Sequence, residues 1–282
     1  MTKSAFAAPA ALVLVMSLLS AVHTAAQQPT PTATVEEQRI YEDFRAWITV
    51  QPAEVHQLDD DAVFRRYAAF LQTKGKSQAD ATSEIEQVRK IGDRAEVERW
   101  NRILTSPTAA FNKAPNAFLA EMVKGMRPGR ALDVGMGQGR NTIFLAQQGW
   151  DAVGFDPADR AVAAAQQQAA QLGVKITTRV ARAEDFDWGT AQWDLIVLSY
   201  VGGRDSVSNV VRSLRPGGMV LIEGFHRDAT KTQPIGGAVV FDTNELLTLY
   251  SALRVVRYED TEGVADFGLE KVRVVRLLAQ KP

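Results

Sequence analysis

The chain of 282 residues contains no cysteine, and this absence excludes several kinds of chemistry. Without thiols there are no disulfides, no cysteine nucleophile, no cysteine-ligated zinc and no lipoprotein anchor. Histidine is scarce as well, with three residues in the whole sequence, and no cluster of histidine and acidic residues has the spacing of a metal site. The sequence therefore predicts no bound metal.

An excess of positive charge is also missing. The 32 Lys and Arg residues are balanced by 33 Asp and Glu residues, so the net charge is −1 and the isoelectric point is near 6.3. The basic residues are scattered, and no cluster of basic and aromatic residues recurs. Such a surface disfavours a nucleic-acid partner and favours a small molecule. Nothing in the composition predicts an oligomeric state.

The first 26 residues differ in composition from the rest of the chain. Lys3 is their only charged residue, Ala5–Val22 is small and apolar, and Thr24-Ala25-Ala26 places small residues at positions −3 and −1 of a cleavage site. This layout predicts a secretory signal peptide over 1–26, followed by a flexible linker at 27–35. We expect export to the periplasm or the medium, with no stable membrane association after cleavage. An uncleaved anchor and a cytoplasmic protein are the alternatives.

Residues 36–114 are predicted to be a helical region, because apolar residues recur there at helical spacing. Gly92-Asp93 separates the last two apolar stretches, and residues 115–123 are expected to form one more short helix. The expected core of this layer includes Trp47, Trp100, Phe111 and Phe118. We interpret residues 112–116 as a lid loop.

Residues 115–282 alternate between strand and helix patterns and predict a second domain. Strands are expected near 130–135, 151–155, 174–180, 193–199, 218–225, 253–259 and 271–279. Helices are expected near 140–149, 158–172, 204–215 and 243–251. Short connections between alternating elements favour an α/β fold, a doubly wound, mainly parallel seven-stranded sheet with helices on both faces. About a dozen residues join the last two strands, so the final strand should be antiparallel.

One stretch of this domain carries most of the functional signal. An apolar run at 131–134 leads into Gly135, Gly137 and Gly139, a helix-forming run follows, and a second apolar run ends in Asp156. This is the first βαβ unit of a nucleotide-binding sheet, in which glycines allow positive φ angles and the acid accepts hydrogen bonds from ribose hydroxyls. An ordinary turn with chance glycines is the alternative.

The spacing of the glycines indicates which nucleotide binds. The third glycine comes one position early for a dinucleotide fingerprint, and Arg140 follows it. Asp133, two residues before the first glycine, suits a cationic ligand better than a pyrophosphate. S-adenosylmethionine has an ammonium, a sulfonium and a ribose but no phosphate. An NAD(P)-dependent oxidoreductase on a Rossmann-like fold is the alternative.

The motif from Asp133 to Gly139 resembles the first motif of the class I S-adenosylmethionine-dependent methyltransferases. Residues 193–200 are similar to the fourth strand of that family, and residues 214–223 to its L-x-P-G-G turn and fifth strand. The run Gly139-Arg140-Asn141 is most similar to the tellurite-resistance and thiopurine-type small-molecule branch. The resemblance implies a strand order of 3-2-1-4-5-7-6 over residues 115–282, with the helical region as a cap.

The resemblance also implies the reaction, which is in-line transfer of a methyl group from S-adenosylmethionine to an O, N, S or chalcogen atom of a small molecule. The D/N-P-P-Y/F motif of amino-methylating nucleic-acid enzymes is absent, since Ser199-Tyr200-Val201-Gly202 stands in its place. Arg182 replaces an Asp that many relatives carry after the third strand. Adenine recognition therefore falls to Ala183, Glu184 or Asp185.

The candidate site residues follow from these motifs. Arg140 is a partner for the cofactor's carboxylate. Tyr200 and His226 follow the fourth and fifth strands, where they are candidates for catalysis, although a pocket wall and an exposed loop are their plainer interpretations. The predicted cofactor-binding set is Asp133, Gly135, Gly137, Gly139, Arg140, Asn141, Asp156, Pro157, Ala183, Glu184 and Ser199.

Export conflicts with a cofactor that is made in the cytosol. This conflict, together with Arg182, motivates a further alternative, which is an exported, non-catalytic binding protein derived from the methyltransferase fold. The intact glycine motif favours the enzyme, because three glycines at such positions are kept for a bound ligand.

The N-terminal pattern makes a direct prediction about processing. The chain should be cleaved after Ala26, so that the mature protein begins at Gln27. Fractionation of producing bacterial cells followed by N-terminal sequencing checks this. Soluble cytosolic protein with an intact Met1 would contradict export and would remove the conflict with a cytosolic cofactor.

Overall fold

A computed structural model describes residues 34–52, 55, 60–108, 111–232, 235 and 239–282. The predicted signal peptide and most of the predicted linker lie outside these residues. Within the described part of the chain, no helix combines the length and the apolar character needed to cross a membrane.

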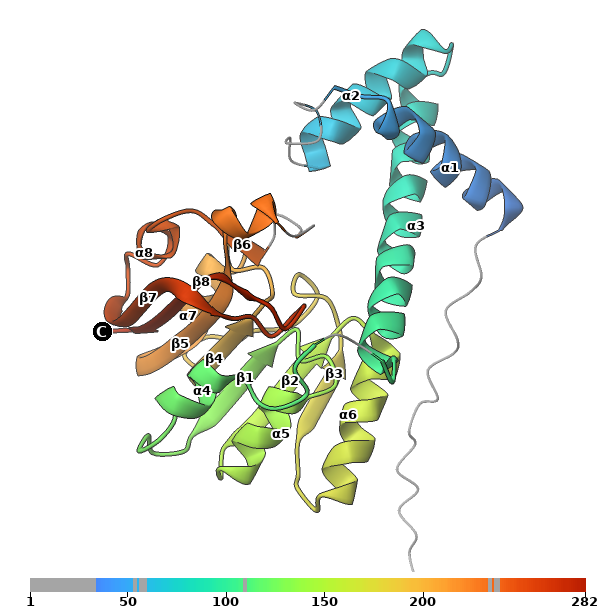
Figure 1. Cartoon of the computed structure of the whole chain (residues 1–282). Coiled ribbons are helices and arrows are strands. Elements are labelled where there is room, and N and C mark those ends of the chain that lie inside the picture. Colours follow the sequence, from blue (N-terminus) through green and yellow to red (C-terminus); the bar gives the residue numbers. More distant parts are fainter. Residues whose placement is uncertain (1–33, 53–54, 56–59, 109–110, 233–234, 236–238) are drawn as a thin grey trace, which may run out of the picture.

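A single mixed sheet forms the centre of the C-terminal domain (Figure 1). Its strands are β1 (Arg130–Val134), β2 (Asp151–Asp156), β3 (Thr177–Val180), β4 (Trp193–Ser199), β5 (Leu214–His226), β6 (Val240–Phe241), β7 (Arg254–Val264) and β8 (Lys271–Gln280). The order is β3-β2-β1-β4-β5-β8-β7, and β8 is antiparallel to both of its neighbours. The predicted order and the antiparallel last strand are therefore confirmed.

The short strand β6 was not predicted. It pairs in parallel with the end of β5, through Phe225 with Val240 and His226 with Phe241. Two residues are too few to show an alternating pattern, so the sequence alone does not reveal this strand. It extends the sheet at the carboxyl end of β5.

Helices cover both faces of the sheet. On one face lie α4 (Ala117–Met122), α5 (Arg140–Gln147) and α6 (Asp159–Gln171), and on the other α7 (Val207–Ser213) and α8 (Glu245–Leu249) (Figure 1). Side chains alternate between the two faces along each strand. In β4, Leu195 and Val197 pack toward α4 and α5, whereas Ile196 and Leu198 pack with α7 and α8.

The N-terminal region consists of α1 (Val35–Thr49), α2 (Asp60–Thr73) and α3 (Gln78–Thr105). The expected break at Gly92-Asp93 is wrong, since α3 runs through it as one helix of 28 residues. Tyr41 of α1 packs beside the bare backbone of Gly92, so the glycine serves contact between two helices. Helix α1 begins one residue before the predicted helical region.

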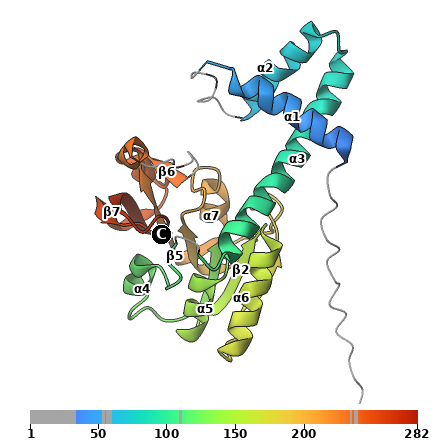
Figure 2. The ribbon, with the colours of Figure 1, turned by 45° about the vertical axis from the view of Figure 1, so that its right-hand side comes forward.

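Helices α1 and α2 pack around the N-terminal half of α3, and the C-terminal half of α3 reaches the sheet domain (Figure 2). Of the four aromatic residues expected in the helical core, Trp47 lies there. Trp100 and Phe111 instead pack at the sheet domain, and Phe118 is a buried residue of α4 that packs against the sheet. The prediction was wrong for Trp100 because α3 is long enough to reach the sheet domain, and for Phe111 and Phe118 because the residues after α3 belong to that domain.

Asn101 attaches α3 to the sheet domain. Its amide Nδ2 donates to the Asp159 carboxylate at 2.7 Å, and its Oδ1 accepts the Arg160 backbone N–H at 3.0 Å. Both partners lie in the first turn of α6, where backbone donors have no partner within the helix. The end of α3 is thereby fixed beside the end of β2.

Gly92 offers a test of the helical region. A Cβ at this position would lie 3.6 Å from Cε2 of Tyr41, which is ordinary contact. Glycine inside a helix costs about 1 kcal/mol relative to alanine. We expect Gly92→Ala to raise the free energy of unfolding by about 0.5–1 kcal/mol in urea titrations.

Gly224→Ala is the contrasting variant, because its Cβ would lie 2.8 Å from the backbone oxygen of Val239. This variant should be less stable than the wild type. A loss of stability in Gly92→Ala would show that the α1–α3 contact leaves no room for a methyl group.

Candidate active site

The glycine motif forms the turn between β1 and α5. Gly135, Gly137 and Gly139 have φ values of +64°, +54° and +76°, which side chains with a Cβ rarely adopt. Gly139 is also the residue that precedes the first turn of α5, and a Cβ there would lie 2.8 Å from the Cβ of Ala165 in α6. The motif thus sets the turn and brings α5 and α6 close together.

Asp156 ends β2 beside this turn. One carboxylate oxygen accepts the Gly137 backbone N–H at 2.9 Å, and the other accepts that of Ala158 at 2.8 Å. Burial raises the pKa of Asp156, and the two backbone bonds oppose the rise. Each carboxylate oxygen can accept a second hydrogen bond, so the group can hold the turn and still accept from a diol.

Asp133 is buried and faces into the fold. Its Oδ2 accepts the hydroxyl of Thr142 at 2.6 Å, which ties the end of β1 to α5. Burial raises the pKa of this carboxyl to about 6, against the hydrogen bond from Thr142 and the charge of Arg140. The side chain therefore stabilises the glycine turn by joining the strand before it to the helix after it. Its direct contact with a ligand stays a prediction.

Arg140, at the start of α5, is paired within the protein. Its Nη2 donates to Oδ2 of Asp266 at 2.6 Å and to the hydroxyl of Ser199 at 3.3 Å. Asp266 lies in the tip of the β7–β8 hairpin, and both side chains are largely buried, with 15% and 7% exposure for Arg140 and Asp266. The ion pair joins the hairpin to the carboxyl edge of the sheet.

The loop interpreted as a lid is held by the same carboxylate. Asn112 and Asn116 donate through Nδ2 to Asp266 at 2.9 and 2.8 Å. The Asn116 backbone N–H also donates to Oδ1 of Asn141 at 2.9 Å. In this arrangement the loop is closed against the start of α5, and Asn141 holds the loop by accepting its hydrogen bond.

Tyr200 follows β4 in a left-handed backbone conformation with a φ of +57°. Its hydroxyl donates to Oε1 of Glu223 at 2.7 Å, and the Arg276 Nε donates to the other oxygen at 2.7 Å. Burial and the Glu223 charge raise the pKa of Tyr200 far above its usual value. The phenol is therefore a fixed hydrogen-bond donor at neutral pH rather than a base.

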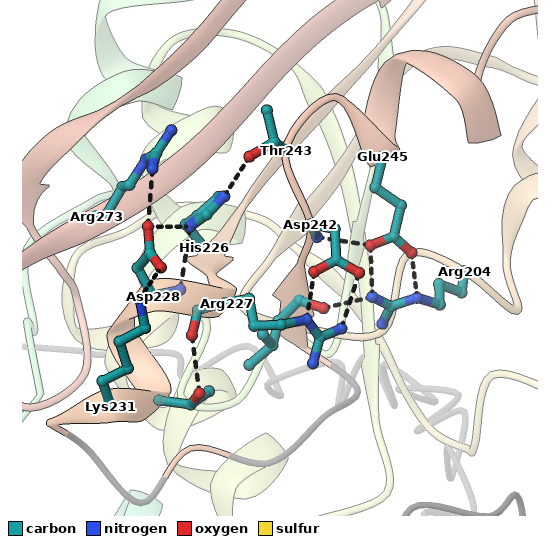
Figure 3. A network of polar contacts seen from close by, with 11 residues as sticks. Arg204, His226, Arg227, Asp228, Lys231, Asp242, Thr243, Glu245 and Arg273 are labelled. Atoms are coloured by element: carbon teal, nitrogen blue, oxygen red, sulfur yellow. Dashed lines mark hydrogen bonds and ion pairs between the residues drawn. The ribbon is translucent and has the colours of Figure 1, made fainter.

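His226 lies on the other face of the sheet. Glu223 and Phe225 of β5 contact Tyr200, and side chains alternate along a strand, so His226 points toward the opposite face. There its Nε2 pairs with Thr243 at 2.9 Å, and its Nδ1 accepts the Asp228 backbone N–H at 3.1 Å (Figure 3). The imidazole caps a short 3₁₀ helix, Arg227–Lys231, within an ionic network that includes Arg273. The structure therefore does not bring His226 and Tyr200 together.

The segment after β3 lies at the same edge as the glycine turn. The backbone oxygen of Ala183 accepts the indole N–H of Trp188 at 2.9 Å, and Glu184 is exposed. Arg182, the departure noted in the sequence, forms an ion pair with Asp93 of α3 at 3.3 Å. Its position is thus explained by a contact with the helical region.

Several residues at this edge were missed in the sequence. Phe267, next to Asp266, packs edge-on against Trp100 and Tyr200 at ring distances of 6.2 and 5.6 Å and tilted against Phe111 at 5.7 Å. The hairpin tip carries no local motif, and its partners Asn112, Phe111 and Trp100 lie 154 or more positions away. No pattern within the sequence could have placed these side chains together.

Comparison with known proteins now gives the family. Residues 131–218 match a family model described as a methyltransferase domain. This match and the strand order support a class I methyltransferase domain. The matched segment contains the glycine turn, Asp156 and the turn into β5.

Individual relatives are distant. The chain is 28% identical over 178 residues to Hemagglutinin 1 of Eikenella corrodens, covering 59% of each protein. It is 26% identical to a ubiquinone biosynthesis O-methyltransferase of Bordetella avium, covering 48% of this chain and 63% of that protein. The chain thus spans about three-fifths of the length of these relatives.

The fold is shared with TehB from Haemophilus influenzae. The two structures superpose with a TM-score of 0.51 at 21% identity, over 59% of this chain and 62% of TehB. This likeness shows that the two proteins share a fold.

The buried Asp133 makes a prediction about pH. Because its pKa is raised from 3.8 to about 6, the folded state binds the proton more tightly than the unfolded state, and stability falls as the pH rises through this range. A shift of this size corresponds to about 3 kcal/mol. The stability of Asp133→Asn relative to the wild type should therefore rise by up to about 3 kcal/mol between pH 4 and pH 7.

Urea unfolding of both proteins at several pH values measures this difference. The exposed Asp205→Asn serves as control and should show a constant difference from the wild type. A pH-independent difference for Asp133→Asn as well would mean that Asp133 is ionised at no cost in the folded protein.

Proposed function

We propose that the chain transfers a methyl group from S-adenosylmethionine to a small-molecule acceptor. The observation that carries this proposal is the glycine turn with three positive φ angles, closed onto the Asp156 carboxylate at the end of β2. A turn of this kind brings backbone close to a nucleoside, and the adjacent acid suits a ribose diol.

The residues present fit the cofactor. Asp156 would hold the ribose, Arg140 the carboxylate of the amino-acid part, and the backbone around Ala183 and Glu184 the adenine. The chemistry supplied by the bound cofactor is a methyl group activated by a sulfonium. The third glycine comes one position early for a dinucleotide motif, and Asp133 precedes the turn, which together disfavour a pyrophosphate-bearing dinucleotide.

The acceptor would lie between the hairpin tip and the end of β4. Tyr200 offers a hydroxyl that Glu223 and Arg276 hold in place, and the rings of Trp100, Phe111 and Phe267 exclude water. In-line displacement gains most of its rate from alignment and exclusion of water. Because His226 faces the other side of the sheet, we propose a mechanism without an imidazole base.

The proposed class of methyl acceptor is supported by a relative of the chain and by the net charge of the chain. The name of one relative, a ubiquinone biosynthesis O-methyltransferase, supports a small acceptor, and the resemblance in the sequence implies that its reacting atom is O, N, S or a chalcogen. The net charge of −1 supports the same view against a nucleic acid.

Substitution of Asp156 tests the proposal. Asp156→Ala should weaken the binding of S-adenosylhomocysteine by roughly ten- to a hundredfold, since charged hydrogen bonds contribute about 1.5–3 kcal/mol. Asp156→Asn retains one acceptor oxygen for the backbone N–H groups of the turn. Comparison of the two variants therefore separates the loss of hydrogen bonds to the ribose from a distortion of the turn. Isothermal titration calorimetry gives the dissociation constants.

The control is Asp151→Ala, at the exposed opposite end of the same strand. It should bind with wild-type affinity. Failure of the wild-type protein to bind S-adenosylhomocysteine at millimolar concentration would end the proposal.

A further inference from the structure

Asp266, at the tip of the β7–β8 hairpin, forms hydrogen bonds through both its side chain and its backbone. Its carboxylate accepts hydrogen bonds from Arg140, Asn112 and Asn116, and its side chain is 7% exposed. Its backbone oxygen accepts the Asn112 N–H at 2.7 Å, and its own N–H donates to the Tyr200 hydroxyl at 3.3 Å. A single residue thus joins the hairpin, the loop at 111–116, α5 and the end of β4.

The same closed arrangement places apolar side chains on the glycine turn. Cδ2 of Leu104, in the last turn of α3, lies 3.3 Å from the position that a Cβ on Gly137 would take. Cγ2 of Val201 lies 2.9 Å from the corresponding position on Gly135. In glycine turns of this kind the second glycine lets the ligand approach the backbone, so Leu104 lies beside the glycine that a bound nucleoside would approach most closely.

The end of α3, the loop and the hairpin tip are also coupled through aromatic contacts. Phe267 follows Asp266 directly and contacts Trp100 of α3 and Phe111 of the loop, with which it also forms a backbone bridge. A displacement of the tip would therefore release the loop and remove one contact from the end of α3, which stays attached to α6 through Asn101. The carboxylate of Asp266 is the charged group that keeps this tip in place.

We propose that the Asp266 carboxylate competes with the carboxylate of the bound ligand for Arg140, so that the hairpin tip is an autoinhibitory contact. This inference rests on the proposed function, in which Arg140 receives the amino-acid end of the cofactor. Binding would exchange one ion pair for another, would free the tip and the loop, and would loosen the packing of Leu104 against the glycine turn. Affinity would then be reduced by the fraction of molecules held closed.

The test compares Asp266→Asn with the wild type. The amide has no negative charge and directs an NH₂ toward donors, so the variant should favour the released tip. We expect it to bind S-adenosylhomocysteine roughly tenfold more tightly in calorimetry. An unchanged affinity would overturn the competition, and so would a weaker one, which would assign Asp266 to positioning Arg140 for the ligand.

Asp260→Asn is the matched control. Asp260 lies on the same hairpin, its side chain is 12% exposed, and it accepts two hydrogen bonds from Arg273 at 2.6 and 3.0 Å. Loss of this ion pair removes a charge of similar burial without touching Arg140. Its affinity for S-adenosylhomocysteine should equal that of the wild type, and a gain equal to that of Asp266→Asn would overturn the inference.

Hydrogen exchange without ligand separates the inference from the proposed function. Backbone amides at 100–105 and 111–116 should exchange faster in Asp266→Asn than in the wild type or Asp260→Asn. Unchanged exchange rates in Asp266→Asn would overturn the inference that the Asp266 carboxylate holds the hairpin tip and the loop in place. Binding by neither protein would overturn the proposed function and the competition with it, whereas wild-type binding with no gain in the variant would overturn only the competition.

Discussion

The carboxyl edge of the sheet buries four carboxylates, and the need to pair each of them organises the rest of the domain. An unpaired charge in such a place costs several kcal/mol, so donors have to converge on every one. Asp133 is paired with Thr142, Asp156 with two backbone N–H groups, Glu223 with Tyr200 and Arg276, and Asp266 with Arg140 and two asparagines. These bonds define the glycine turn, the end of β4, the hairpin tip and the loop before α4.

The four carboxylates differ in what they can do chemically. Asp133 and Glu223 are enclosed and bound to side chains of their own domain, so they hold neighbouring elements in place. Each carboxylate oxygen of Asp156 accepts one hydrogen bond from a backbone N–H group and can accept a second from a ligand beside the glycine turn. Asp266 lies at the tip of the β7–β8 hairpin and is the one member of the four that forms an ion pair with Arg140, the arginine for which we propose a role in ligand binding.

The two faces of the sheet have separate roles. The face that carries α4, α5 and α6 holds the glycine turn, Tyr200, Glu223 and the docked end of α3. The opposite face holds His226 in an ionic network around β6 and the 3₁₀ helix (Figure 3). A histidine and a tyrosine that both follow neighbouring strands can thus lie on opposite sides, because successive side chains of one strand alternate in direction.

The resemblance of the sequence to a known family implied the strand order. The sequence by itself determined the alternation of strands and helices and the positions of the glycine turn and Asp156. These depend on local signals: glycines at alternate positions, apolar runs of strand length and acids at strand ends. Only the tertiary structure decided that Asp133 faces Thr142, that Arg140 is paired with Asp266, and that Trp100 and Phe111 belong to the sheet domain. The Arg140–Asp266 pair joins residues 126 positions apart, and none of these contacts leaves a periodic trace in the sequence, so they emerge only when the hairpin, α3 and the sheet pack together.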